Sequence, residues 1–212
     1  MARLKVQTLG ITSYRDGLTA QAEAVSALEA EAETSLTSIA LVTEHLPCIT
    51  LGRRGLAEVD VLWSSERLRE SGFEIVQTER GGQATLHSPG QLVIYPITRV
   101  PHRGVRRFVE AVQNATQTAL RTLGVDSQLG DEPGLYADGA KLVAFGFQVA
   151  SGTSRHGLAI NVSNDLSLFE SIRVCGQSGV RLTSLEHQIG LTDMELVAAT
   201  WAREWEKALP NL

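Results

Sequence analysis

Apolar residues change their spacing several times along the chain, and each change predicts a new element. Over residues 4–9 apolar and polar side chains alternate, which is the period of a β-strand. From residue 14 the apolar residues recur at every third or fourth position, which is the period of a helix: Leu18, Ala22, Val25 and Leu28. The first part of the chain is therefore predicted to form a strand followed by a helix.

The middle of the chain is rich in β-branched residues interrupted by turn formers. Residues 38–44 and 48–52 predict two short strands, and His45 and Pro47 between them favour a hairpin. The pattern that follows predicts a short helix over 60–71, strands over 73–77 and 91–97, a long helix over 105–123, and a second hairpin made of 141–150 and 156–162.

A last helix is predicted near the end of the chain. Thr192 and Glu195 fit a capping box, and the buried face is expected to contain Leu196, Ala199, Trp201 and Trp205. Hairpins mixed with a few helices, without strict alternation of strand and helix, predict an α+β fold with a mixed, largely antiparallel sheet flanked by helices. No linker divides residues 1–212, so we expect a single domain.

Composition narrows the class of protein. The chain has 212 residues, of which 43% are hydrophobic and 20% charged, as is usual for a folded globular protein. No apolar run approaches the ~20 residues of a membrane span, so a cytoplasmic protein is expected. The net charge of −5 argues against a nucleic-acid binder. Cys48 and Cys175, far apart in the sequence, are expected to be free thiols.

The segment 80–91 holds the densest group of candidate binding residues. Gly81 and Gly82 admit a ligand to the backbone, while Arg80, His87 and Gln91 offer polar contacts. A binding loop and a wide turn between strands explain this composition about equally well. The Walker pattern and its lysine are missing, which argues against a phosphate loop.

Cys175 is a candidate nucleophile. It is followed by Gly176, and Gly179 lies close behind, so the sulfur has room for an incoming carbonyl. Most free cysteines are small buried hydrophobes, however, and from its surroundings alone Cys175 would be assigned to that majority. Cys48, between Pro47 and Ile49, fits such a packing role well.

Lys141 and the histidines are the other candidates. Lys141 precedes an apolar run and could act as a base, although a lysine at a strand end usually reaches solvent. His87 and His156 lie in probable site segments, whereas His45 and His187 are predicted to be surface residues. Metal-ligand spacing is absent, so no metal and no other cofactor is expected.

A basic cluster precedes the long helix in this acidic chain. Arg103, Arg106 and Arg107 could dock an acidic partner protein, or they could form a solvated helix start. The second explanation is disfavoured because cations near a helix N-terminus oppose the helix dipole.

Several of these segments together resemble the octanoyl-[acyl-carrier-protein]:protein octanoyltransferases, the lipoate-protein ligase B family. The matching motifs lie in order between about Leu9 and Leu185: Glu44-His45, Thr50 to Gly55, Arg80 to Gln83, His87, Tyr95 to Ile97, Gly139 to Lys141, His156 to Val162, Cys175-Gly176 and Thr183 to Leu185. The resemblance implies the catalytic-domain fold of lipoate ligases and biotin protein ligases.

The resemblance also implies roles for individual residues. Cys175 takes the position of the residue that carries the acyl group as a thioester, and Lys141 that of the lysine which assists it. The implied acyl-binding cleft contains Arg80, Gly81, Gly82, Gln83, Ala84, Thr85, Leu86, His87, Ala144, Phe145, Gly146, Gly157, Leu158 and Ala159. Leu86, Ser88 and Val174 depart from the family, where an aromatic residue, a glycine and a proline are common.

The implied reaction is the first step of endogenous protein lipoylation. The donor is octanoyl-acyl carrier protein, and the acceptor is a lysine in the lipoyl domains of 2-oxoacid dehydrogenase complexes or in the glycine cleavage H protein; we expect the enzyme to be a monomer. Alternatives are an ATP-dependent lipoate or biotin ligase, a cysteine hydrolase pairing Cys175 with His87 or His156, and a non-catalytic lipoyl-domain binder.

Overall fold

A seven-stranded sheet forms the centre of the protein. The computed structural model describes residues 4–30, 38–174, 176 and 179–209. The strand order is β1 (Leu4–Thr12), β2 (Ser38–His45), β6 (Gln91–Thr98), β10 (Thr153–Asn161), β9 (Ala140–Ala150), β8 (Gly134–Ala137) and β7 (Gln128–Leu129). β1 and β2 are parallel, and all other neighbours in this sheet are antiparallel. The predicted α+β class with a mixed, largely antiparallel sheet is confirmed, as is the hairpin of β9 and β10.

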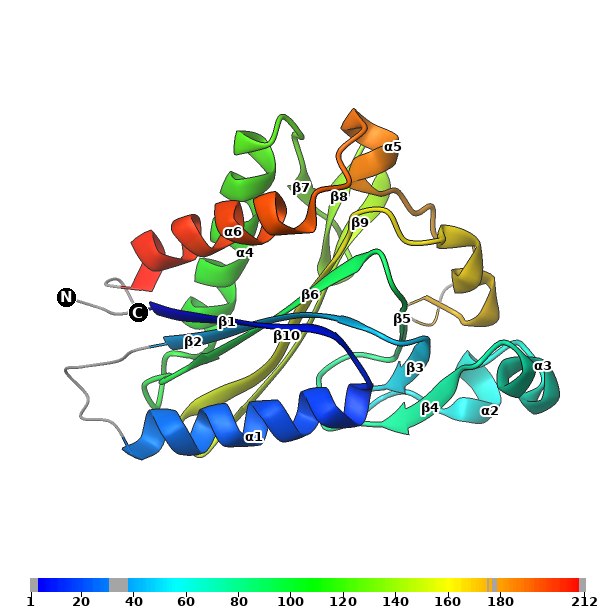
Figure 1. The fold of residues 1–212 in the computed structure, drawn as a ribbon, viewed down its shortest axis with the longest axis horizontal. Coiled ribbons are helices and arrows are strands. Elements are labelled where there is room, and N and C mark those ends of the chain that lie inside the picture. Colours follow the sequence, from blue (N-terminus) through cyan, green and yellow to red (C-terminus); the bar gives the residue numbers. More distant parts are fainter. Residues whose placement is uncertain (1–3, 31–37, 175, 177–178, 210–212) are drawn as a thin grey trace.

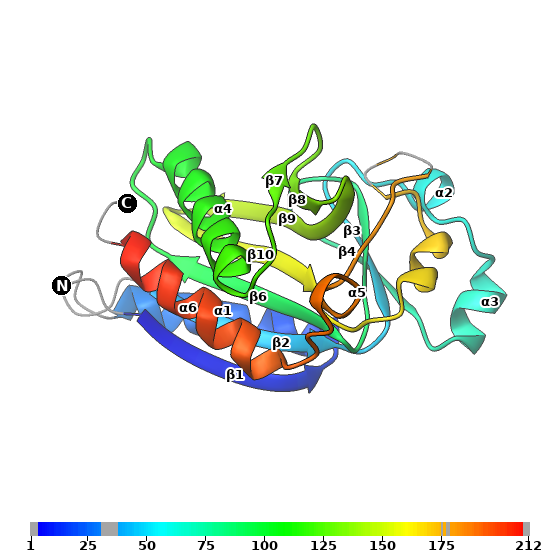
Figure 2. The same ribbon diagram turned by 90° about the horizontal axis from the view of Figure 1, so that it is seen from above.

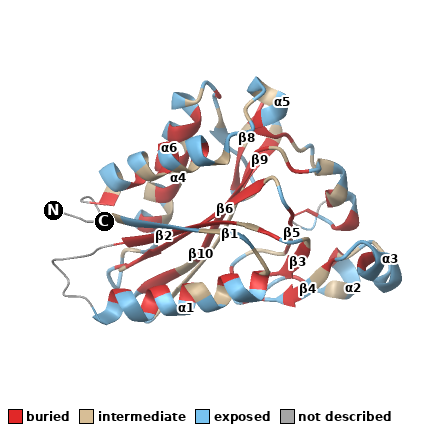
Figure 3. Cartoon of the chain, in the orientation of Figure 1, coloured by how far each residue is buried: buried red, intermediate tan, exposed pale blue. Residues whose placement is uncertain are grey.

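Helices cover both faces of this sheet (Figure 1). α1 (Tyr14–Ala30) lies along one face, and α4 (Val105–Thr122) and α6 (Met194–Ala208) lie on the other. Each helix is amphipathic, so its buried stripe meets the sheet and its polar side faces water, as the burial colours of Figure 3 show.

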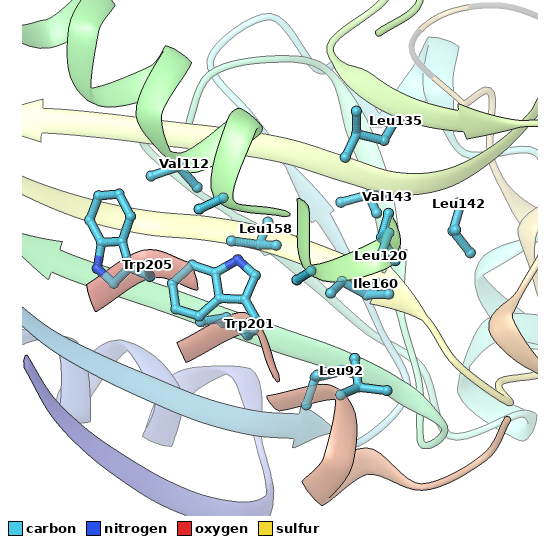
Figure 4. Packing of buried hydrophobic residues seen from close by; sticks show 14 of the residues in the cluster. Leu92, Val112, Leu120, Leu135, Leu142, Val143, Leu158, Ile160, Trp201 and Trp205 are labelled. Atoms are coloured by element: carbon cyan, nitrogen blue, oxygen red, sulfur yellow. The ribbon is translucent and has the colours of Figure 1, made fainter. Parts of the chain in front are cut away.

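The face under α4 and α6 is packed with large apolar side chains. Phe108, Trp201 and Trp205 are fully buried there, with Phe108 and Trp205 edge to face at a centroid distance of 6.0 Å. Figure 4 shows the two tryptophans of α6 above β6 and β10. Both indole N–H groups are satisfied, because Trp201 donates to Thr116 Oγ1 at 2.9 Å and Trp205 to Ser38 Oγ at 3.1 Å.

α6 begins one residue later than the sequence predicts. Asp193, rather than Thr192, caps it by accepting a hydrogen bond from the Leu196 N–H at 2.9 Å. Trp201 and Trp205 are buried as expected, but Leu196 and Ala199 are exposed, so that part of the prediction is wrong.

A second, three-stranded sheet stands beside the large one. Its order is β4 (Glu74–Gln77), β3 (Cys48–Leu51) and β5 (Ala84–His87), with α2 (Ala57–Asp60) and α3 (Ser65–Glu70) next to it (Figure 2). The predicted hairpin of 38–44 and 48–52 is therefore wrong. β2 is paired on both sides, by β1 and β6, which leaves no free edge for β3.

The predicted helix over 60–71 is formed only in part, as α3, while α2 already ends at Asp60. Between them Val61 forms a bridge with Ile172, and the Arg173 N–H donates to the Asp60 carbonyl at 2.8 Å. These bonds hold the chain in an extended form that interrupts the helix. Residues 172–174, which lie between the 3-10 helix η1 (Leu166–Ser171) and Cys175, are bound by these bonds to the chain next to the small sheet.

The last short helix, α5 (Leu185–Ile189), connects the site segment to α6 and ends at Gly190 in the left-handed conformation. Within the described ranges, no helix has the length and apolar character needed to cross a membrane.

Candidate active site

Small residues on two neighbouring strands form the floor of a groove. In the β9–β10 ladder Ala144 pairs with Ala159, and Gly146 pairs with Gly157. Residues two apart on a strand point to the same face, so these four positions leave a shallow trough on the α1 side of the sheet. The two predicted segments, 144–146 and 157–159, are thereby brought together.

The strap formed by residues 80–83 passes over this floor. The Gly81 N–H donates to the Phe147 carbonyl of β9 at 3.0 Å, while Arg80 donates to the Thr50 carbonyl of β3 at 2.6 Å. A Cβ at position 52 would lie only 2.4 Å from the Gly82 carbonyl oxygen, so glycine is required at Gly52. The strap is fixed to both sheets and encloses a pocket of about 70 Å³.

Most of the predicted binding residues line this pocket. They are Arg80, Gly82, Gln83, Ala84, Thr85, His87, Lys141, Ala144, Phe145, Gly146, Gly157, Leu158 and Ala159. Gly81 and Leu86 are not in the lining. Side chains alternate along β5, so Thr85 and His87 face the pocket while Leu86 packs into the small sheet's core. The expectation that Leu86 contacts the acyl chain is therefore corrected.

Lys141 lies at the wall of the pocket and is only 3% exposed. Both backbone groups of Lys141 are bonded to the segment that follows Cys175. The Lys141 N–H donates to the Arg181 carbonyl at 2.8 Å, and the Thr183 N–H donates to the Lys141 carbonyl at 3.0 Å. Its ammonium nitrogen is 5.8 Å from the centre of the Tyr136 ring. A strand-end lysine reaching solvent, the alternative considered from the sequence, is excluded.

Cys175 itself lies outside the described residues, but the positions around it are placed. Val174, buried at 9% exposure, lines the pocket together with Lys141. Gly176 has a φ of +72°, and a Cβ there would lie 2.4 Å from Nε2 of Gln83 in the strap. The chain therefore passes the pocket immediately before and after the predicted nucleophile.

Cys48 is a packing residue, as predicted. It is 2% exposed in β3, and burial raises the pKa of its thiol to about 12, with a smaller contribution from the charge of Glu74. A thiol that is neutral at physiological pH and shielded from water is a poor nucleophile.

A cluster of three histidines and two tyrosines lies under the strap. His45, predicted to be at the surface, is fully buried and bonds to the Tyr95 hydroxyl at 2.6 Å. The rings of Tyr14 and His87 stack at 5.7 Å. Burial lowers the pKa of His45 and His156 to about 4 and of His87 to about 3, so all three are neutral at pH 7. Exposed His187 agrees with its prediction.

A chain of side-chain hydrogen bonds connects this cluster to the segment that holds Lys141. His87 donates from Nδ1 to Gln91 Oε1 at 2.7 Å, and Gln91 donates to Asn161 Oδ1 at 3.0 Å. Asn161 in turn donates to the Thr183 carbonyl at 3.1 Å. The position of Lys141 is thus coupled to residues of three different strands.

Sequence reasoning missed Tyr14, Tyr95 and Asn161 as pocket residues. A signal for two of them was present. Tyr95 and Asn161 each interrupt an aliphatic strand, and in a strand buried on both faces a polar side chain needs a partner. Tyr14 carried no such signal, because it stands at the start of a helix.

The basic cluster is far from Lys141. Arg103, Arg106 and Arg107 are exposed around the start of α4, and Arg106 pairs with Glu110 at 2.8 Å. Arg99, just before them, bridges to Thr153 at the turn that joins β9 to β10. Lys141 is at the opposite end of β9, nine residues from Ala150 or roughly 30 Å at the usual strand rise.

Comparison with known proteins agrees with this arrangement. Residues 14–206 match the family model of the lipoyl protein ligase A/B catalytic domain, which takes in every described strand except β1 and all residues that line the pocket. The chain belongs to this family.

The similar curated members of this family are octanoyltransferases. The octanoyltransferase of Maridesulfovibrio salexigens is 40% identical over 167 residues, 77% of this chain and 75% of that one. The octanoyltransferase of Saccharophagus degradans is 32% identical over 212 residues, 99% of this chain and 93% of that one. The resemblance to the octanoyltransferases inferred from the motifs is confirmed, and with it the assignment to the acyltransferase enzymes.

Solved structures show the shared fold at much lower identity. A bipartite lipoate protein ligase from Thermoplasma acidophilum has a TM-score of 0.80 at 16% identity, covering 99% of this chain and 85% of that one. Biotin protein ligase from Aquifex aeolicus has a TM-score of 0.57 at 13% identity, covering 98% and 71%. The fold expected of this lipoyl protein ligase A/B family member is confirmed.

Proposed function

We propose that this octanoyltransferase family member transfers an octanoyl group from octanoyl-acyl carrier protein to a lysine of a lipoyl domain, through a thioester on Cys175. The acceptors would be the lipoyl domains of 2-oxoacid dehydrogenase complexes and the glycine cleavage H protein. The observation that carries this proposal is the meeting of buried Lys141 with Val174, the neighbour of Cys175, at one apolar-floored pocket.

The first step is thioester exchange. The Cys175 thiolate attacks the carbonyl carbon of the octanoyl thioester, the carbon–sulfur bond to the carrier breaks, and the carrier's thiolate leaves and takes up a proton. Lys141 either stabilises the Cys175 thiolate by its charge or accepts the thiol proton. The exchange is close to balanced in energy because one thioester replaces another.

A backbone amide of the strap is the candidate oxyanion donor. The Gly176 N–H already donates to the Arg173 carbonyl at 3.3 Å. Gly82 lines the pocket and has a φ of +91°, a conformation that favours glycine. We therefore assign the developing oxyanion to the Gly82 N–H in preference to that of Gly176.

The second step releases the product. The acceptor lysine amine attacks the Cys175 thioester, the carbon–sulfur bond breaks, the amine loses a proton, and an amide forms. Conversion of a thioester to an amide is downhill, so the reaction needs no ATP. The missing phosphate loop is consistent with this, and an ATP-dependence assay separates the proposal from a ligase that activates its acid as an adenylate.

Mass spectrometry after incubation with octanoyl-acyl carrier protein tests the intermediate. We expect one octanoyl adduct, on the peptide containing Cys175, which hydroxylamine removes. The matched variants are Cys175→Ala, expected to lose the adduct and the activity, and Cys48→Ala, expected to keep both because Cys48 is a buried packing residue. An enzyme that turns over with Cys175 unmodified would contradict the scheme.

A further inference from the structure

The pocket has two chemically different ends. Along β9 and β10, Lys141 and Asn161 lie at one end, while Gly146, Gly157 and His156 lie at the other. His156 pairs with Phe147, six residues beyond Lys141, so the backbone positions at the two ends are roughly 20 Å apart, and the side chains of Lys141 and His156, which both line the pocket, shorten the space between them. A chain attached near Lys141 would lie on Ala144 and Ala159 and point toward His156.

The far end is closed by polar side chains. The Tyr14 hydroxyl meets His156 Nδ1 at 3.4 Å, and both residues line the pocket. Arg80 crosses beside them, since a Cβ at Gly146 would lie 3.1 Å from Arg80 Cδ. The apolar floor therefore ends abruptly against a hydroxyl, an imidazole and a guanidinium.

This end is held in place by the backbone. His156 has a φ of +57°, which is rare for a residue with a side chain, and its N–H donates to Gln21 Oε1 of α1 at 2.7 Å. Tyr14 is 2% exposed at the start of the same helix, and His156 is 5% exposed. The backbone of His156 is therefore fixed to α1, the same helix that carries Tyr14.

We propose that Tyr14 and His156 form the wall that ends the acyl pocket and sets the longest chain the enzyme accepts. This inference rests on the proposed function, because it takes the pocket to hold the acyl chain. A methylene that fits on the apolar floor contributes roughly fourfold to binding, whereas one pushed against the polar wall contributes nothing or clashes. Acceptance should therefore fall sharply beyond a fixed length.

The test compares small-molecule acyl thioesters from hexanoyl to tetradecanoyl, with acylation of Cys175 measured by mass spectrometry. His156→Gly is the informative variant, since glycine tolerates the positive φ. We expect the ratio of decanoyl to octanoyl acylation rates to rise roughly fifteenfold in His156→Gly, which corresponds to two additional buried methylenes at roughly fourfold each.

His187→Ala is the control, because it removes an imidazole that is exposed and is not part of the pocket lining. Its decanoyl-to-octanoyl ratio should equal that of the wild type. An unchanged ratio in folded His156→Gly overturns the wall while the proposed function stands. A wild-type protein that accepts no acyl thioester of any length overturns both.

Discussion

The two faces of the seven-stranded sheet differ in what their side chains do. Under α4 and α6 the face is filled by large apolar residues, among them Phe108, Trp201 and Trp205. The other face is packed against α1 by apolar residues along most of that helix, but under the strap it carries small residues and a neutral histidine, with Lys141 at one end. The first face buries area and stabilises the fold, and the second gives up some of that packing to hold a substrate. Substitutions in the pocket should therefore lower activity more than stability, and substitutions under α4 and α6 should lower stability more than activity.

The largest expected effect on the pocket face comes from Lys141→Met. Methionine has a similar length without the charge, so the floor and the hydrogen-bonded backbone of β9 are kept. Loss of a proton-transfer or charge-stabilising group should lower kcat by roughly 10²–10⁴-fold. The variant should still fold, because methionine fills a similar volume in the same strand. Loss of folding instead of activity, seen by circular dichroism, would contradict the separation.

On the other face the matching substitution is Trp201→Ala. Removal of this fully buried indole should lower the free energy of unfolding by about 3–5 kcal/mol. The specific activity of the folded fraction should stay close to that of the wild type. Leu196→Ala on the same helix is the control, since its exposed side chain should change stability by less than about 0.5 kcal/mol. Urea unfolding measures both variants.

Low pH should reduce the free energy of unfolding through the buried histidines next to the pocket. His45, His87 and His156 have pKa values lowered to between about 3 and about 4 in the folded protein, against about 6.5 when unfolded. The unfolded chain therefore binds more protons, and stability present above pH 6.5 is lost as the pH falls toward 4. Each histidine contributes a slope of up to about 1.4 kcal/mol per pH unit.

Urea unfolding at pH 7 and pH 5 measures this loss. His45→Gln should reduce the slope by one histidine's share, while a substitution of exposed His187 should leave it unchanged. Equal stability of the wild type at both pH values would show that the three imidazoles do not titrate as their burial requires.

The smallest effect is expected from charge reversal of Arg103, Arg106 and Arg107. The end of β9 nearest to them is roughly 30 Å from Lys141, more than the Debye length of about 8 Å at physiological ionic strength, so their charges act on KM only if the carrier protein touches them directly. We expect less than a twofold change in KM for octanoyl-acyl carrier protein. A tenfold rise would show that the carrier docks at this end of the sheet, as the sequence first suggested.

Sequence periodicity predicted the elements that depend on local contacts, but not the strand pairings that depend on long-range contacts. The long α4 and the β9–β10 hairpin have clear apolar patterns and short-range connections, so both were predicted correctly. The pairing of β2 with β1 and β6 depends on long-range contacts that no local pattern specifies. The burial of His45 could not be predicted for the same reason, because only the tertiary fold brings this residue against Tyr95.

In the site, too, local sequence indicated some features, while others depend on long-range contacts. The glycines of the strap indicate a close approach without saying to what, and the structure places Gly81 against Phe147. Spacing alone gave no reason to pair Lys141 with Cys175, and only the resemblance to the octanoyltransferase family implied that pairing. The structure adds that the backbone of Lys141 is bonded to Arg181 and Thr183, in the segment that follows Cys175.

A single-turnover transfer from the isolated octanoyl-enzyme tests the thioester mechanism most directly. The octanoyl-enzyme, freed of carrier protein, is mixed with a lipoyl domain in the absence of ATP, and both proteins are followed by mass spectrometry. We predict that the octanoyl group leaves Cys175 and appears as an amide on the lipoyl-domain lysine, at a rate no slower than steady-state turnover. An adduct that stays on the enzyme, or moves only when ATP is added, would contradict the central claim.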